Sequence, residues 1–345
     1  MEVKELMLRL SAAVGVSGRE AAAVELAAQE LAKLGEVRTD SLGSLICTVK
    51  PARPGKKHFM LDAHVDEIGM IVTCIEENGF LRVAPCGGFD RKLLLASQVE
   101  VHAEEGVLPG VICSIPPHLQ SGEKPNPKVD ELFIDIGYDK KEAERRTAPG
   151  DMVTFHARCR EMAGGYITGK ALDNRSGCAA VMRAAELLAG EELDCGLSVT
   201  LTTREEINAA GAAAASFSVN PTHAITVDVS FAHTPDAKKE KCGELGKGPM
   251  IGFSPILSHE MSRTLVETAK ERQIPWQVEV MGGETGTNAD AIVPVRGGIR
   301  TGVVSVPQAY MHTPVEKIDP ADVENTARLL AEYVKKEAAA HAEEN

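Results

Sequence analysis

Histidines and carboxylates stand at several points where the sequence predicts the end of a strand, and such side chains bind divalent metals. The first pair is His64 and Asp66, which follow the apolar run 59–61. Residues separated by two project from one face of an extended chain. The aspartate could therefore orient the imidazole or share its metal environment. Taken alone, a His-x-Asp pair is more often an ordinary surface feature.

A pair of adjacent glutamates, Glu205 and Glu206, follows the expected strand 197–201. Neighbouring carboxylates that leave an apolar strand raise the free energy of the fold unless a cation or protons offset their charge. One glutamate could bind a metal while the other acts as a base on bound water. An exposed pair with no function is the alternative.

Three further residues have the same character. Asp173 opens an expected helix and could be a simple cap, because aspartate is a preferred N-terminal capping residue. Asp228 stands at the end of the buried strand expected over 224–228, and His312 lies in a turn fixed by Pro314. Each also has a structural explanation when it is considered alone.

Together, these side chains supply the ligand set of a dinuclear metal site. Two divalent ions about 3.5–4 Å apart need a bridging carboxylate and one or two further ligands each. Imidazole with carboxylate suits zinc, cobalt or manganese, and the lack of cysteine at these points argues against a structural zinc site. A glutamate beside such ions can accept the proton of a water that they acidify.

The elements that must position these residues alternate between helix and strand at both ends of the chain. A helix over 21–34 and a pair of strands over 44–50 and 58–63 are expected first. After residue 169 helices and strands alternate again, and the last element is a helix over 320–340. We therefore predict an α/β fold, with a mixed central sheet flanked by helices.

The middle of the chain has a different pattern of residue types. Its segments are short and rich in β-forming residues, and Asn78-Gly79 is a strong hairpin signal. We predict a β-rich, barrel-like domain over residues 68–158, inserted into a catalytic domain formed by residues 1–67 and 159–345.

Composition limits the partners. The 345 residues include 37 Lys and Arg against 50 Asp and Glu, and the net charge of −13 disfavours nucleic acid or an anionic membrane as a partner. No apolar run approaches the roughly 20 residues of a membrane span. The eight cysteines form no CxxC pair, which favours free thiols in a reducing compartment. We therefore expect a cytoplasmic protein.

Five motifs, in this order, resemble those of the TET-type (tetrahedral) aminopeptidases. This family of cytosolic metallopeptidases includes glutamyl and deblocking aminopeptidases, and some members were once labelled endoglucanases. The resemblance covers nearly the whole chain. The motifs are His64-x-Asp66-Glu67-x-Gly69, the run 169–175 around Asp173, Glu205-Glu206, Asp228, and His312-Thr313-Pro314-Val315-Glu316.

The resemblance implies a role for each site residue. Asp173 would bridge two metal ions, zinc or cobalt first and manganese as a further option. His64 and Asp228 would complete one metal site, and Glu206 and His312 the other. Glu205 would be the general base, and Asp66 would hold His64 in orientation. The peptide bond between Asp173 and Asn174 would be cis.

The resemblance also implies partners. The substrates would be short peptides that lose their N-terminal residues. The inserted domain would form a homodimer, and six dimers would build a hollow tetrahedral dodecamer.

Two departures from the family pattern concern substrate choice more than metal binding. Asn208 stands where the family has glycine, and Asn288 replaces the aspartate of Gly-Thr-Asp-Ala.

Two other functions are alternatives: a metal-binding scaffold or regulatory oligomer without catalysis, and a hydrolase of another substrate such as a glycan. Glycosidases usually add aromatic platforms to their two carboxylates, and this chain has one Trp and 4% aromatic residues.

Overall fold

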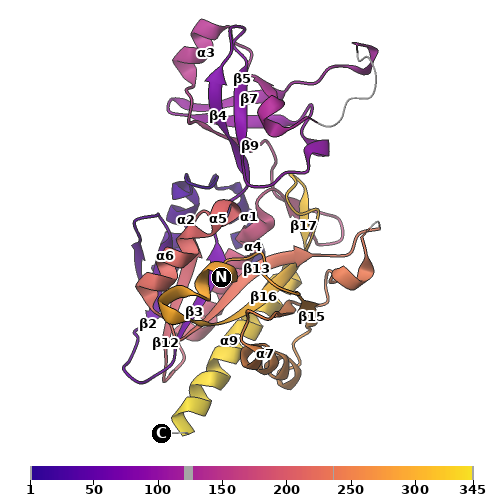
Figure 1. The fold of residues 1–345 in the computed structure, drawn as a ribbon. Helices are drawn as coiled ribbons and strands as arrows, with labels where there is room; N and C mark the ends of the chain where they lie inside the picture. The colour runs from indigo at the N-terminus through magenta and orange to yellow at the C-terminus, as the bar shows by residue number, and fades with distance from the viewer. Residues whose placement is uncertain (1, 120–126, 236, 344–345) are drawn as a thin grey trace.

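The computed structural model describes residues 2–119, 127–235 and 237–343. It consists of an 11-stranded mixed sheet flanked by helices and of a closed, six-stranded antiparallel barrel (Figure 1). The barrel stands at one end of the α/β part, at the top of Figure 1. The predicted fold class is confirmed.

Four parallel strands form the centre of the large sheet. β3 pairs with β12 and β13, and β13 pairs with β16. Their side chains are buried almost throughout, because helices cover both faces of the sheet. Parallel strands bring their carboxyl ends to one edge, where α/β folds place ligands. These strands are β3 (His58–His64), β12 (Gly196–Thr202), β13 (His223–Phe231) and β16 (Arg300–Ala309).

Further strands extend the sheet on both sides, and they pair antiparallel except for β14 with β15. β1 and β2 join through β12, while β17, β11 and β10 continue beyond β16, and β14 and β15 branch from β16. The bounds of these strands are β1 (Glu36–Thr39), β2 (Leu45–Lys50), β10 (Arg160–Glu161), β11 (Ile167–Gly169), β14 (Met250–Phe253), β15 (Gln277–Val280) and β17 (Glu316–Ile318).

Two details of the sequence prediction are wrong. The strands expected as a pair, β2 and β3, are separated by β12, which is far away in sequence. Asp228 does not end its strand, because β13 continues to Phe231, which pairs with Gln308 of β16.

Alternate residues of β3 pack on opposite faces of the sheet. Phe59 and Leu61 belong to the main core, whereas Met60 packs with Ala212 and Ile292 on the other side. The main core is covered by α1 (Val3–Ala12), α2 (Ala21–Leu31), α4 (Leu172–Ala189), α7 (His259–Glu271) and α9 (Pro320–Glu343). The second face carries α6 (Ala210–Val219) and α8 (Ala289–Ile292), and α5 (Glu205–Asn208) precedes α6.

The barrel has a core of its own. Val83, Val101, Ile134 and Phe155 are among its buried residues. The expected hairpin is present, since Ile75 pairs with Leu81 across the Asn78-Gly79 turn. The barrel strands are β4 (Gly69–Ile75), β5 (Leu81–Cys86), β6 (Gln98–Ala103), β7 (Gly106–Ile112), β8 (Phe133–Asp135) and β9 (Met152–Phe155), and α3 (Lys140–Arg146) precedes β9.

Short 3-10 helices occur at Arg91–Leu93, Pro117–Leu119, Val129–Glu131, Lys239–Lys241 and Val295–Gly297. Within the described parts of the chain, none of the helices is both long and apolar enough to cross a bilayer.

We predict that Asp322, near the start of α9, makes stability depend on pH. Its carboxylate accepts hydrogen bonds from the backbone N–H groups of Gly246 and Gly248, each at 2.7 Å. Burial raises the pKa of Asp322 from 3.8 to about 6, although these donors oppose the shift. The folded chain therefore holds this proton more tightly than the unfolded chain, so the contribution is complete below pH 3.8 and is lost as pH rises through about 6.

Denaturant unfolding of wild type and Asp322→Asn measures this effect. The free energy of unfolding of wild type, relative to the variant, should fall by up to about 3 kcal/mol between about pH 4 and pH 7. A difference that stays constant or rises with pH would contradict the prediction.

Candidate metal centre

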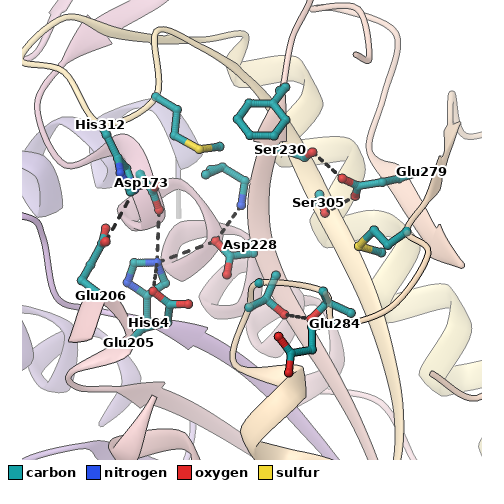
Figure 2. Close-up of a pocket in the computed structure, with 17 residues that line it drawn as sticks. His64, Asp173, Glu205, Glu206, Asp228, Ser230, Glu279, Glu284, Ser305 and His312 are labelled. Atoms are coloured by element: carbon teal, nitrogen blue, oxygen red, sulfur yellow. Dashed lines mark hydrogen bonds and ion pairs between the residues drawn. The ribbon is translucent and has the colours of Figure 1, made fainter. Parts of the chain in front are cut away.

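Six of the seven predicted site residues line one pocket of about 650 Å³ at the carboxyl edge of the central strands (Figure 2). His64 is the last residue of β3, and Asp228 lies on β13. The glutamates begin α5 just after β12. Elements far apart in sequence therefore bring the pocket together at the edge where the parallel strands end. The six residues are His64, Asp173, Glu205, Glu206, Asp228 and His312.

Asp173 occupies the centre of this group. Its Oδ1 lies 3.1 Å from Nε2 of His64, and its Oδ2 lies 3.3 Å from Nε2 of His312. The two oxygens of one buried carboxylate thus face two different imidazoles. The Asp173–Asn174 peptide is cis, as the resemblance implied, and Nδ2 of Asn174 donates to the carbonyl of Val227 at 2.8 Å.

Two groups of possible ligands share Asp173. Asp228 Oδ1 lies 3.7 Å from His64 Nε2, and Glu206 Oε2 lies 3.5 Å from His312 Nε2. Within each group the ligand atoms lie within 4.8 Å of one another. A third overlapping group joins His64 with Glu205 and Glu206, so Glu205 is also close enough to be a ligand. The first two groups are His64, Asp173 and Asp228, and Asp173, Glu206 and His312.

Asp66 lies behind the pocket and holds two of its parts. Nδ1 of His64 lies 3.2 Å from the Asp66 carbonyl and 3.4 Å from its Oδ1. The Asp66 carboxylate also accepts hydrogen bonds from the backbone N–H groups of Glu205 (3.0 Å) and Glu206 (3.1 Å), and from the hydroxyl of Ser17 (2.6 Å). Burial opposes ionisation, but these partners lower the pKa of Asp66. One carboxylate thus fixes the imidazole and the turn that carries both glutamates.

Glu316 has a similar position, which the sequence analysis did not identify. Its Oε2 accepts from the N–H of Asp173 and its Oε1 from the N–H of His312, both at 3.1 Å. The available signal was its place in the His-Thr-Pro-Val-Glu motif, four residues after His312. The side chain is buried and ties the two backbone segments together.

The backbone is left-handed at several points around the pocket. Ala171, Arg204 and His312 have φ angles of 58°, 62° and 59°. This conformation is unfavourable for residues other than glycine, and it is kept at functional sites where the surroundings enforce it. Glu20 supports one of these points, because its Oε1 accepts from the N–H of Arg204 at 3.2 Å.

The electrostatics show an excess of negative charge. Burial raises the pKa of Glu205 to about 8 and that of Glu206 well above its usual range, and neighbouring carboxylates add to both shifts. The pKa of Asp228 is raised for the same first reason. The pKa of Asp173 is lowered instead, because its contacts with His312 and His64 outweigh its burial.

His64 shows the opposite response to the same field. Burial disfavours its protonated form, yet Glu205, Asp173, Asp228 and Asp66 together raise its pKa well above the usual value. The pocket therefore favours positive charge wherever it can be placed. Divalent cations fit this donor set of imidazole nitrogens and carboxylate oxygens, and no cysteine lines the pocket among the described residues.

The two departures from the family pattern lie outside the cluster. Asn288 is fully buried and does not line the pocket; its Nδ2 donates to Asp62 (2.9 Å) and to the hydroxyl of Thr202 (2.7 Å). An aspartate here would face the buried carboxylate of Asp62, so the amide removes a repulsion. Asn208 is exposed at the end of α5 and accepts from the N–H of Ala210 at 3.1 Å.

Comparisons with known proteins identify the family of this chain. A model of the M42 glutamyl aminopeptidase family matches residues 43–329. Lysyl aminopeptidase of Pyrococcus furiosus is 34% identical over 332 residues, which cover 94% of each chain.

Solved structures give the same result. The TET aminopeptidase of the marine sediment archaeon Thaumarchaeota archaeon SCGC AB-539-E09 superposes with a TM-score of 0.92 at 29% identity, covering 99% of both chains. The TET1 peptidase of Pyrococcus horikoshii, described as able to assemble into a tetrahedron or a large octahedral shell, gives 0.85 at 30% identity, over 96% of this chain and 99% of that one. Because the family match covers most of the chain and the relatives nearly all of it, this chain belongs to the M42 family of aminopeptidases.

Proposed function

We propose that the chain is a dinuclear-metal aminopeptidase that removes N-terminal residues from short peptides. The observation that carries the proposal is the position of Asp173, whose two oxygens face His64 and His312 separately. Asp173 would bridge two divalent cations. His64 and Asp228 would complete one site, and Glu206 and His312 the other. The cations would be zinc or cobalt, with manganese also compatible with these ligands.

Bound cations would polarise the scissile carbonyl and lower the pKa of a water molecule in the pocket. Glu205 then accepts a proton from the attacking water as its oxygen bonds to the carbonyl carbon. The C–N bond breaks, and Glu205 returns the proton to the leaving amine. Two features support this role: Glu205 lines the pocket, and the ligand groups that share Asp173 do not require it.

Two carboxylates near Glu205 would keep the reacting groups in fixed positions. Asp66 would hold His64 and the N–H groups of Glu205 and Glu206, so that a base and a ligand stay at fixed positions. Glu316 would hold Asp173 and His312 in the same way. The free α-amine that an aminopeptidase must recognise would be attracted by the acidic side chains of the pocket.

We further propose that residues 68–158 form a separate domain that makes a homodimer, and that dimers can assemble further into a dodecamer. Apolar side chains on and beside β7 support the first step, because Val107, Val111 and Ile115 are exposed by 55%, 46% and 50%. The shell described for the TET1 peptidase supports the second. Eight free cysteines support a cytoplasmic location, and the net charge gives no reason to expect nucleic acid or membrane partners.

We predict that Glu205→Gln abolishes most activity without loss of metal. The amide cannot accept the proton of the water, so kcat for aminoacyl-anilide substrates should fall by roughly 10²–10⁴-fold. Metal content, measured by elemental analysis after loading with cobalt or zinc, should equal that of wild type. Unchanged turnover would contradict the role of Glu205 as the base. Loss of both metal and activity would indicate that Glu205 is a metal ligand instead.

We predict that Asp173→Asn loses both metal ions, because an amide cannot bridge two cations as a carboxylate does. Asp228→Asn is the matched comparison and should weaken only one of the two sites. Titration of the chelator-treated protein with cobalt, followed by elemental analysis and absorbance, measures the number bound. Retention of two ions at wild-type affinity by Asp173→Asn would exclude a bridging role.

We predict that Val111→Glu weakens the homodimer, because a charge buried in an apolar contact is unfavourable. Light scattering after size exclusion should show a shift toward the monomer mass. Val278→Glu is the control, since Val278 is similarly exposed (51%) but lies on β15 of the large sheet. Equal masses for wild type and Val111→Glu would place the contact elsewhere.

A further inference from the structure

The pocket extends from the candidate metal centre toward two carboxylates outside it, those of Glu279 on β15 and Glu284 (Figure 2). One oxygen of Glu279 accepts a hydrogen bond from the hydroxyl of Ser230. The other accepts from the hydroxyl of Ser305 at 2.7 Å. Both serines are buried, so the carboxylate is held on a firm support. None of these three residues belongs to the ligand groups around Asp173.

Glu279 has no cationic partner among the residues that the structure describes. Neither lysine nor arginine is found among the described residues that line the pocket. Burial raises the pKa of Glu279, whereas the two hydroxyl donors lower it and so favour the ionised form. A half-buried carboxylate with hydroxyl donors on one side and an open pocket on the other is a strong acceptor for a cation.

The serines that support Glu279 lie about one long side chain's length from Asp228 of the candidate metal cluster. Ser305 is the direct neighbour of Asp228 across the β13–β16 pair, and Ser230 lies two residues beyond Asp228 on the same face of β13. Two residues along a strand span about 7 Å. A lysine side chain reaches about 6 Å from its α-carbon to its ammonium nitrogen, by its bond lengths.

The walls of the pocket suit the apolar part of such a side chain. Phe231, Met281 and Met311 line it together with Glu279. The methylene groups of lysine or arginine pack well on apolar surfaces while the charged end reaches a polar partner. Methionine side chains adapt easily to either shape.

We propose that this part of the pocket binds the side chain of the first substrate residue, and that Glu279 selects lysine or arginine there. The inference rests on the proposed aminopeptidase function. Glu279 would pair with the ammonium or guanidinium group and would repel acidic residues. It is thus assigned as a specificity residue, and it takes no part in bond breaking.

A panel of lysyl, arginyl, leucyl and glutamyl anilides tests this inference on the metal-loaded protein. Wild type should show its highest kcat/KM with the lysyl and arginyl substrates and its lowest with the glutamyl substrate. Glu279→Gln keeps the side-chain shape but removes the charge, and should lower kcat/KM for the lysyl and arginyl substrates roughly 10- to 100-fold, mainly through KM. Its leucyl activity should stay within about threefold of wild type.

Two further variants separate charge from structure. Glu279→Asp keeps the charge and should retain more of the lysyl preference than Glu279→Gln. Glu267→Gln carries the same substitution on the exposed face of α7 and should leave the substrate profile unchanged.

Three results would decide against the inference or its basis. A wild-type preference for leucyl or glutamyl substrates would overturn it. An equal loss of all substrates by Glu279→Gln would also overturn it, because Glu279 would then bind the common α-amine or support the fold. No turnover of any substrate by the metal-loaded wild type would instead contradict the proposed function itself.

Discussion

Repulsion among the carboxylates of Asp173, Glu205, Glu206 and Asp228 sets the conditions that every element around the pocket has to meet. These groups lie close together in a pocket that removes much of their hydration, and burial raises the pKa of three of them. Left alone, such a group would bind protons or spread apart. The surrounding fold nevertheless holds these carboxylates together, as the proposed binding of cations would require.

The central sheet and two further buried carboxylates hold these groups in place. The parallel strands β3, β12, β13 and β16 end at one edge of the sheet. Pairing within the sheet fixes the positions of the residues at that edge. Two buried carboxylates, Asp66 and Glu316, then hold the turns through backbone N–H groups. Backbone hydrogen bonds fix the position of a ligand without using its donor atoms. The proposed ligands would therefore remain free to bind metal while their chain segments are held together.

Much of the candidate site could be predicted from sequence, because its residues occur in ordered motifs with fixed chemistry. The fold class and the convergence of the six pocket residues followed from these motifs and from the alternation of helix and strand. The insertion of β12 between β2 and β3 could not be predicted, since strand order depends on contacts between distant segments. The contacts of Glu316, Glu279 and Asn288 could not be predicted for the same reason. Each is defined by a partner 26 or more residues away in the sequence, such as Ser305 for Glu279, Asp173 for Glu316 and Asp62 for Asn288.

Anomalous diffraction from crystals of the cobalt- or zinc-loaded protein tests the central claim most directly. The account predicts two metal peaks about 3.5–4 Å apart, with Asp173 between them. His64 and Asp228 should contact one peak, and Glu206 and His312 the other, while Glu205 contacts neither. A single peak, or two peaks that Asp173 does not join, would contradict the account.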